Sequence, residues 1–268
     1  MTTNGSRTNH DSAVRIVSLY PDLLGTYGDG GNALVFIRRL EWRGIAVDHV
    51  IVEAGEEVPD SADLYLVGGG EDGPQVQAAK ELERSKGVHR AVDKGAVVLA
   101  VCAGMQILGH HFPDASGATQ TGLGLLDCET IHVDRPRAVG ELLTANARLV
   151  RGASSLDLGP LTGFENHAGR TLPGPNSLAL ASVEIGEGNG GGTEGVITGT
   201  VVGTYLHGPA LARNPKLADG LLSWIVGTSA LTTLDDSDIE ILRSERIRAA
   251  REHELAPRRS WRDVLKRS

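Results

Sequence analysis

Apolar runs and segments with helical spacing alternate along the first hundred residues of the chain. Four runs of four to six residues are mostly apolar, which is typical of strands buried on both faces of a parallel sheet. Between them, apolar residues recur every three to four positions, as on one face of a helix. This order predicts an α/β fold with a doubly wound, mostly parallel sheet. The predicted strands are 14–19, 47–52, 64–67 and 96–101, and the predicted helices are 33–43, 75–84 and 87–94.

The second half of the chain is β-rich and is followed by a charged segment. Gly188 to Gly192 has the composition of a flexible hairpin tip. From residue 235 an acidic beginning and a basic end predict a helix, with Ile239, Leu242 and Ile247 as a thin apolar stripe. This helix is either a surface helix packed on the domain or a partner-docking tail. The predicted strands of this half are 129–133, 147–150, 178–184, 195–198 and 201–205.

These patterns divide the chain into three parts. Residues 1–13 are polar and read as a disordered leader. Residues 14–227 carry the α/β pattern and its β-rich continuation, and residues 228–268 form a charged helical C-terminal extension.

Three glycine-rich turns follow predicted strands: Gly28 to Gly31, Gly68 to Gly70, and a turn near residue 102. Ligands of doubly wound sheets bind at the carboxyl ends of strands, and glycines let backbone N–H groups approach a ligand closely. Neither of the common glycine-rich phosphate motifs is present. Plain tight turns are the alternative for any one of these glycines. In the first turn, Asp29 and Asn32 are the two candidate caps of the following helix.

Cys102 stands where a buried strand ends and a helix begins. Ala100 and Gly104, two residues to either side, are small enough for a sharp strand-to-helix elbow. The helix directs its N-terminus at the cysteine, which favours a thiolate and later an oxyanion. A buried structural cysteine is the alternative reading.

Composition and charge narrow the functional classes. The 268 residues carry a net charge of −8, which argues against nucleic acid as a general partner. The sequence has no apolar run long enough to span a membrane and no signal-peptide core. Two cysteines are too few for a disulfide framework, so we expect a cytoplasmic protein. The Cys and His spacings do not resemble a metal site, and we expect none.

A nucleophilic cysteine needs a base and donors for an oxyanion. His207, at a predicted strand end, and His167, in the polar cluster Gly163 to Thr171, are the candidates for the base. We predict that the N–H of Ala103 and that of Gly69 or Gly70 form the oxyanion hole.

The motifs around these residues resemble those of class I glutamine amidotransferases, whose domain is flavodoxin-like. They are most similar to the cobyric-acid-synthase branch and, within it, to the glutaminase (GatD-type) subunits of lipid II isoglutaminyl synthase. The resemblance covers about residues 14–227. It rests on the elbow cysteine with the Gly68–Gly70 turn, and on Tyr27-Gly-Asp-Gly-Gly-Asn32, Gly163-Phe-Glu-Asn-His-Ala-Gly-Arg-Thr171 and Gly203-Thr-Tyr-Leu-His-Gly-Pro209.

The resemblance implies that Cys102 is the nucleophile and His207 its base. Arg137 aligns with an arginine that holds the glutamine substrate, with Arg135 as the alternative. The implied reaction is hydrolysis of L-glutamine to glutamate and ammonia. The ammonia would pass to a MurT-type, Mur-ligase-like synthetase in a heterodimer, which amidates the D-glutamate of lipid II in peptidoglycan synthesis. No cofactor is expected in this chain, because ATP and Mg would belong to the synthetase.

One position departs from most class I amidotransferases, which carry a glutamate two residues after the catalytic histidine. Pro209 occupies that place here. We expect Glu165, a backbone carbonyl or an acid of the partner to orient His207. A glutaminase for another synthetase such as cobyric acid synthase, a γ-glutamyl peptidase, and a non-catalytic binding subunit on the same fold remain alternatives.

Overall fold

The computed structural model of the protein describes residues 13–26, 28–228 and 231–255. Most of the predicted leader and the last part of the predicted extension, residues 256–268, lie outside the described residues. None of the helices in the described ranges has both the length and the apolar character needed to cross a bilayer.

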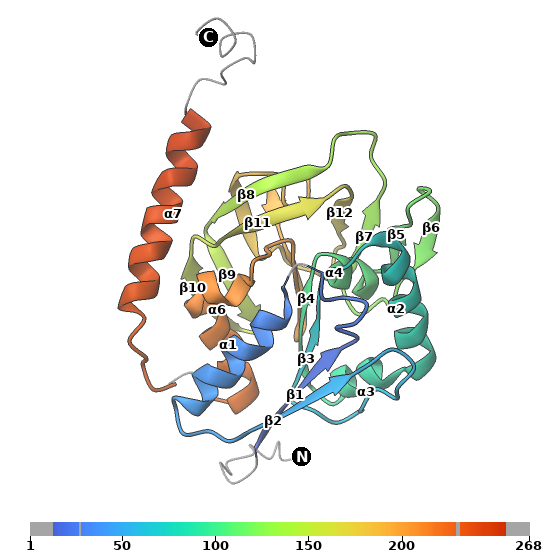
Figure 1. The fold of residues 1–268 in the computed structure, drawn as a ribbon, viewed down its shortest axis with the longest axis horizontal. Coiled ribbons are helices and arrows are strands. Elements are labelled where there is room, and N and C mark those ends of the chain that lie inside the picture. Colours follow the sequence, from blue (N-terminus) through green and yellow to red (C-terminus); the bar gives the residue numbers. More distant parts are fainter. Residues whose placement is uncertain (1–12, 27, 229–230, 256–268) are drawn as a thin grey trace, which may run out of the picture.

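A six-stranded sheet forms the centre of the protein (Figure 1). Its order is β15-β16-β4-β3-β1-β2, and all neighbours are parallel except β15 and β16. Every residue of β4 is buried, as expected for a strand covered on both faces. The strands are β1 (Val14–Leu19), β2 (Val47–Val52), β3 (Leu64–Val67), β4 (Val97–Val101), β15 (Val196–Thr198) and β16 (Val201–Thr204).

Helices cover both faces of this sheet. Helix α1 leads from β1 outward to β2, whereas α2 and α3 lead from β3 to β4 in the opposite direction, so right-handed crossovers place them on opposite faces. The direction reverses between β1 and β3, and a ligand site is expected at the carboxyl ends of these strands. The helices are α1 (Gly30–Glu41), α2 (Asp72–Ser85), α3 (Gly87–Asp93), α4 (Ala103–Leu108), α5 (Ala210–Arg213) and α6 (Pro215–Val226).

A β-rich layer lies beside the central sheet (Figure 1). It contains a four-stranded sheet in the order β11-β8-β13-β14 and two-stranded ribbons. Phe164 N–H donates to His207 O at 3.2 Å, and His207 N–H donates to Phe164 O at 2.8 Å, so β11 is fixed beside the end of β16. The strands are β5 (His111–Pro113), β6 (Thr119–Thr121), β7 (Cys128–Ile131), β8 (Ala138–Ala145), β9 (Ala147–Arg151), β10 (Ser154–Gly159), β11 (Thr162–His167), β12 (Arg170–Pro173), β13 (Ala181–Ile185) and β14 (Thr193–Glu194).

The strands predicted in the first hundred residues match β1 to β4 to within one residue. Helix α1 begins three residues before the predicted helix at 33–43. In the second half the strands β8 and β11 were not predicted. The segment Gly163 to Thr171, interpreted as a polar cluster, forms most of β11 and the beginning of β12.

The charged C-terminal helix is α7 (Ser237–Leu255), which lies along one side of the β-rich layer (Figure 1). Arg251 Nε lies 2.6 Å from Glu184 Oε1 of β13, an ion pair that helps to hold the helix there. The predicted apolar stripe is wrong at Leu242, whose surface is 67% exposed. The side of α7 that meets the body carries arginines as well as isoleucines, so apolar spacing alone did not identify it.

A fully buried carboxyl group, Glu194, lies at the end of β14. Its Oε1 accepts hydrogen bonds from the Thr204 hydroxyl and, at 2.9 Å, from the Tyr205 N–H. Burial raises the pKa of Glu194 because the charged form loses its hydration, and the hydrogen bonds oppose this only in part.

We expect the Glu194→Gln variant to be more stable than the wild type at pH 8 and to lose this advantage near pH 4. Glutamine keeps the oxygen that accepts these hydrogen bonds, but it cannot ionise and so never places a charge in the buried site. Because the folded-state pKa of Glu194 is raised, its contribution to stability is full below the pKa of an unfolded glutamate and is lost as the pH rises. Thermal unfolding from pH 4 to 8 measures this, with about 2–4 °C in Tm for each kcal/mol. A pH-independent difference in Tm would contradict it.

Candidate active site

The elbow at Cys102 has the geometry of a strained turn. Its φ of 50° and ψ of −107° are rarely adopted by a residue with a side chain, and such strain collects at functional sites. The Cys102 N–H donates to Thr204 O at 2.8 Å, which fixes the turn to the end of β16. At Gly104 a Cβ atom would lie 2.5 Å from Val67 O, so only glycine fits this place. The elbow therefore presents Cys102, 5% exposed, at the carboxyl end of β4.

His207 lies at the carboxyl end of the neighbouring strand and is 1% exposed. Its Nδ1 hydrogen-bonds with the side chain of Asp29, and Cys102 lies close enough to influence its pKa. All three converge on one glycine: a Cβ atom at Gly69 would lie 2.7 Å from His207 Cε1, 3.0 Å from Asp29 Oδ2 and 3.5 Å from Cys102 Cβ. Four segments that are far apart in the sequence thus meet at one edge of the sheet, at the position expected from the strand order.

The carboxylate beside His207 is that of Asp29. Its Oδ1 lies 3.3 Å from His207 Nδ1, and its Oδ2 accepts the Gly69 N–H at 2.7 Å. Asp29 is the N-cap residue of α1, but its side chain makes no capping hydrogen bond, so the capping role considered for this side chain is wrong. Asn32 does not cap the helix either, because it lies within α1 and its Oδ1 accepts the Leu211 N–H.

Two opposing effects set the pKa of His207. Burial lowers it, because a buried imidazolium loses hydration, but the hydrogen bonds and charges of Asp29 and Cys102 outweigh burial and raise the pKa to about 10. The raised pKa favours the protonated form of His207. A cation beside a cysteine sulfur favours the thiolate, which is the nucleophilic form.

The predicted oxyanion donors near Cys102 differ in whether their N–H groups already donate a hydrogen bond. Gly69 N–H is engaged by Asp29 Oδ2 at 2.7 Å. Among the described residues, the N–H groups of Ala103 and Gly70 donate to no protein acceptor. Ala103 directly follows Cys102 at the start of α4, so its N–H is the better placed of the predicted donors.

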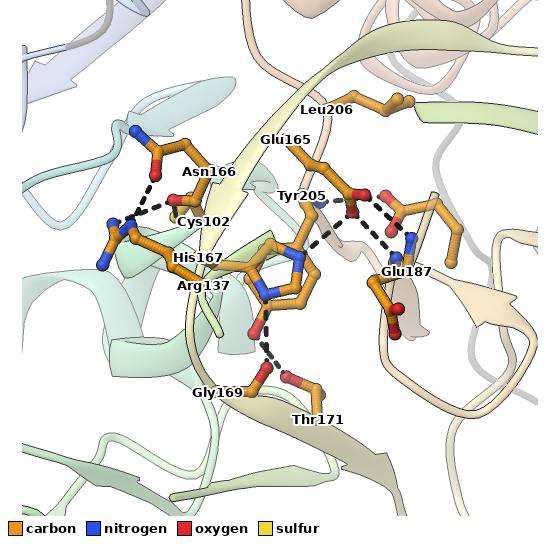
Figure 2. A network of polar contacts seen from close by, with 12 residues as sticks. Cys102, Arg137, Glu165, Asn166, His167, Gly169, Thr171, Glu187, Tyr205 and Leu206 are labelled. Atoms are coloured by element: carbon orange, nitrogen blue, oxygen red, sulfur yellow. Dashed lines mark hydrogen bonds and ion pairs between the residues drawn. The ribbon is translucent and has the colours of Figure 1, made fainter. Parts of the chain in front are cut away.

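The two candidate arginines have different surroundings. Arg137 donates from Nε to Asn166 Oδ1 and from Nη2 to Asn166 O at 3.0 Å. Cys102 Sγ donates to the same carbonyl oxygen at 3.8 Å, so Arg137 lies close to the sulfur (Figure 2). Arg135 instead pairs with Glu187, which lies across β11 from Cys102 in Figure 2. The structure therefore brings Arg137, and not Arg135, to the elbow.

Glu165 and His167 belong to a separate buried network. Glu165 Oε2 lies 3.2 Å from His167 Nε2, and Glu165 also accepts the N–H groups of Glu187 and Gly188. The His167 ring is stacked on Tyr205 at 3.7 Å between centroids. Figure 2 shows Glu165 on the opposite side of β11 from Asn166 and Cys102. Glu165, the acid considered for His207, thus contacts the other candidate histidine, and Asp29 contacts His207.

Asp29 and Asn166 are the residues of this site whose roles sequence reasoning missed. The loop that contains Asp29 follows β1 at the reversal point of the sheet, and this was the available signal for it. Asn166 carried no signal of its own. Within the described ranges, no cluster of three or more His, Cys, Asp or Glu side chains could hold a metal ion.

Residues 15–215 match the family described as the CobB/CobQ-like glutamine amidotransferase domain. The chain belongs to the CobB/CobQ-like glutamine amidotransferase family. It is therefore an enzyme of the amidotransferase class, and the resemblance stated from the sequence is confirmed.

Two similar relatives are GatD subunits of lipid II isoglutaminyl synthase (glutamine-hydrolyzing). That of Streptococcus pneumoniae is 33% identical over 237 residues, which cover 87% of this amidotransferase and 86% of the relative. That of Staphylococcus aureus is 33% identical over 203 residues, covering 75% and 79%. The cobyric acid synthase of Brucella anthropi is 34% identical over 170 residues, but these are 60% of this chain and only 32% of that protein.

A solved glutamine amidotransferase has the same fold. Its TM-score to this amidotransferase is 0.53 at 20% identity, and the match covers 79% of this chain and 99% of the other. The predicted doubly wound amidotransferase fold is thereby confirmed.

Proposed function

We propose that this chain is the glutaminase subunit of a two-subunit enzyme that amidates the D-glutamate of lipid II. It would hydrolyse L-glutamine to glutamate and ammonia in the cytoplasm. The observation that carries the hydrolytic part is the strained Cys102 elbow with the buried His207–Asp29 pair beside it. The GatD relatives, aligned over most of both chains, support lipid II as the acceptor.

In this proposal Cys102 Sγ, as a thiolate, attacks the side-chain amide carbon of glutamine. The carbonyl electrons move to oxygen, and the N–H groups of Ala103 and Gly70 stabilise the resulting oxyanion. When the tetrahedral intermediate collapses, the C–N bond breaks and His207 gives its proton to the leaving ammonia. A thioester with Cys102 remains. His207 then takes a proton from water, which attacks the thioester and releases glutamate and the thiolate, after which the proton stays on His207.

Asp29 supplies the orienting carboxylate in this scheme. Its contact with Nδ1 directs Nε2 of His207 toward the sulfur and stabilises the imidazolium. Its second oxygen, bonded to Gly69, ties the same carboxylate to the turn that precedes Gly70. One side chain thereby orients the base and holds one of the loops beside the thioester.

Ammonia would be used by a MurT-type synthetase bound to this subunit, and ATP and Mg would act there rather than in this chain. The alternative acceptor enzyme, a cobyric acid synthase, is less well supported. The alignment with such a synthase covers a third of that protein, whereas the GatD alignments cover most of the relative.

The proposal is tested by measuring ammonia release from glutamine by the purified chain, alone and with a co-expressed MurT-type synthetase. With lipid II and ATP present, we expect the complex to amidate lipid II with glutamine as the nitrogen source. Glutaminase activity without amidation would favour another synthetase. A lack of glutamine hydrolysis in both preparations would overturn the proposal in favour of a binding subunit.

A further inference from the structure

Asn166 lies between the arginine of the site and its cysteine and contacts both, the arginine through its side chain and backbone and the cysteine through its backbone. Arg137 reaches Asn166 through two donors, Nε to the side-chain oxygen and Nη2 to the backbone oxygen. Cys102 Sγ donates to that same backbone oxygen. Because two of these contacts end on one atom, Nη2 and Sγ can be no farther apart than the sum of 3.0 and 3.8 Å.

These contacts occupy one edge of the guanidinium. A guanidinium can bind a carboxylate with two parallel hydrogen bonds either along its Nε–Nη2 edge or along its Nη1–Nη2 edge. Asn166 fills the first of these edges, which leaves the second edge of Arg137 for a carboxylate. Arg137 is an exposed residue whereas Cys102 is buried, so a substrate that enters from the surface can meet Arg137 while its amide extends to the sulfur.

The backbone of Asn166 is well fixed. It lies in β11 between Glu165 and His167, both of which are buried and hydrogen-bonded, and it is paired in register with Val139 of β8. The position of Arg137 relative to the sulfur is therefore defined by a strand of the scaffold. Without the Asn166 side chain, Arg137 would keep one bond to a backbone oxygen and would be free to turn about it.

We propose that Asn166 is a positioning residue that presents the Nη1–Nη2 edge of Arg137 to the α-carboxylate of the substrate. This inference rests on the proposed glutaminase function. With the carboxylate held at a set distance from Sγ, the amide carbon of glutamine reaches the sulfur, whereas that of asparagine, one methylene shorter, falls short. For asparagine the reacting atoms would therefore be misplaced, and a misplacement of about 1 Å can cost roughly 10²-fold in rate.

The test compares Asn166→Ala with Val139→Ala, using the preparation in which the wild type hydrolyses glutamine. Val139 is the cross-strand neighbour of Asn166 and is 61% exposed, and its side chain takes part in none of the contacts with Arg137 or Cys102 described above, so its truncation is a matched control. We expect Asn166→Ala to raise the KM for glutamine about tenfold or more with a smaller change in kcat. We also expect the preference for glutamine over asparagine to narrow, and Val139→Ala to resemble the wild type.

A double-mutant cycle with Arg137→Ala separates positioning from a general structural effect. If Asn166 acts through Arg137, its replacement should raise the KM in the wild type and have little further effect in the Arg137→Ala background. Asn166→Ser, which also withdraws the amide oxygen, repeats the measurement if the alanine variant is unstable. An unchanged KM, or the same increase in both backgrounds, would overturn the inference. A wild type that does not hydrolyse glutamine would instead defeat the proposed function.

Discussion

Replacing Cys102 by alanine is expected to abolish ammonia release from glutamine, with a loss of roughly 10⁴-fold or more in kcat. Without the sulfur, no thioester can form, and the remaining groups can only stabilise an oxyanion from direct attack by water. The strained turn at Cys102 does not require the sulfur, so the variant should fold. Ammonia release at saturating glutamine measures the loss of activity, and a circular dichroism spectrum shows whether the variant is folded.

Cys128 provides the matched control for this experiment. It is the other cysteine of the chain, it is buried, and burial together with the charges of Asp127 and Glu129 raises the pKa of its thiol to about 12, which keeps it uncharged and unreactive. Cys128→Ala should retain ammonia release. Turnover in Cys102→Ala comparable to that of the wild type, or loss of turnover in a folded Cys128→Ala, would contradict the assignment of the nucleophile.

Replacing Asp29 by asparagine is expected to lower kcat by roughly 10²–10⁴-fold, because the variant loses the charge that stabilises the His207 imidazolium. The pKa of His207, about 10 in the wild type, should fall, since burial continues to lower it while the charge and the hydrogen bond that raise it are weakened. The pH dependence of kcat and the titration of His207 by NMR measure these effects. The part of the kcat–pH profile that reflects the ionisation of His207, its pH limb, should move to lower pH.

Glu165→Gln tests whether Asp29 or Glu165 is the carboxylate that orients His207. Glu165 contacts His167, and glutamine keeps an acceptor oxygen for the N–H groups of Glu187 and Gly188. We expect the pH limb of His207 to remain in place in this variant. If Glu165→Gln moved that limb as far as Asp29→Asn, the assignment of Asp29 as the orienting carboxylate would be wrong.

The central sheet could be predicted because its strands are covered on both sides. Strands such as Val97–Val101 are therefore nearly continuous apolar runs, which remain visible in a single sequence. The strands β8 and β11 contain Gly140, Glu141, Glu165 and Asn166, so neither the alternation nor the apolar run that identifies a strand is present. Their pairing with each other, which holds them extended, is a tertiary contact that local pattern does not contain.

The sequence identified Cys102 and His207 as candidates, and the structure brings them together, but the residues that contact them were not predicted. The small residues on either side of Cys102 indicate the strand-to-helix elbow. The choice of His207 over His167 came from the resemblance to a family. Asp29 was interpreted as a candidate helix cap because local spacing allowed that role. Its actual partner is 178 positions away in the sequence, a relation that follows only from the order of strands in the sheet.

That sequence separation also has a consequence for folding. Asp29, Gly69, Cys102 and His207 follow four different strands, and the contact between the first and the last spans two thirds of the chain. Contacts between such distant segments form late, because the entropy of closing long loops must be overcome first. The candidate active site is thus assembled only when the whole sheet is in place. During refolding, enzymatic activity would return after the helices and strands have formed.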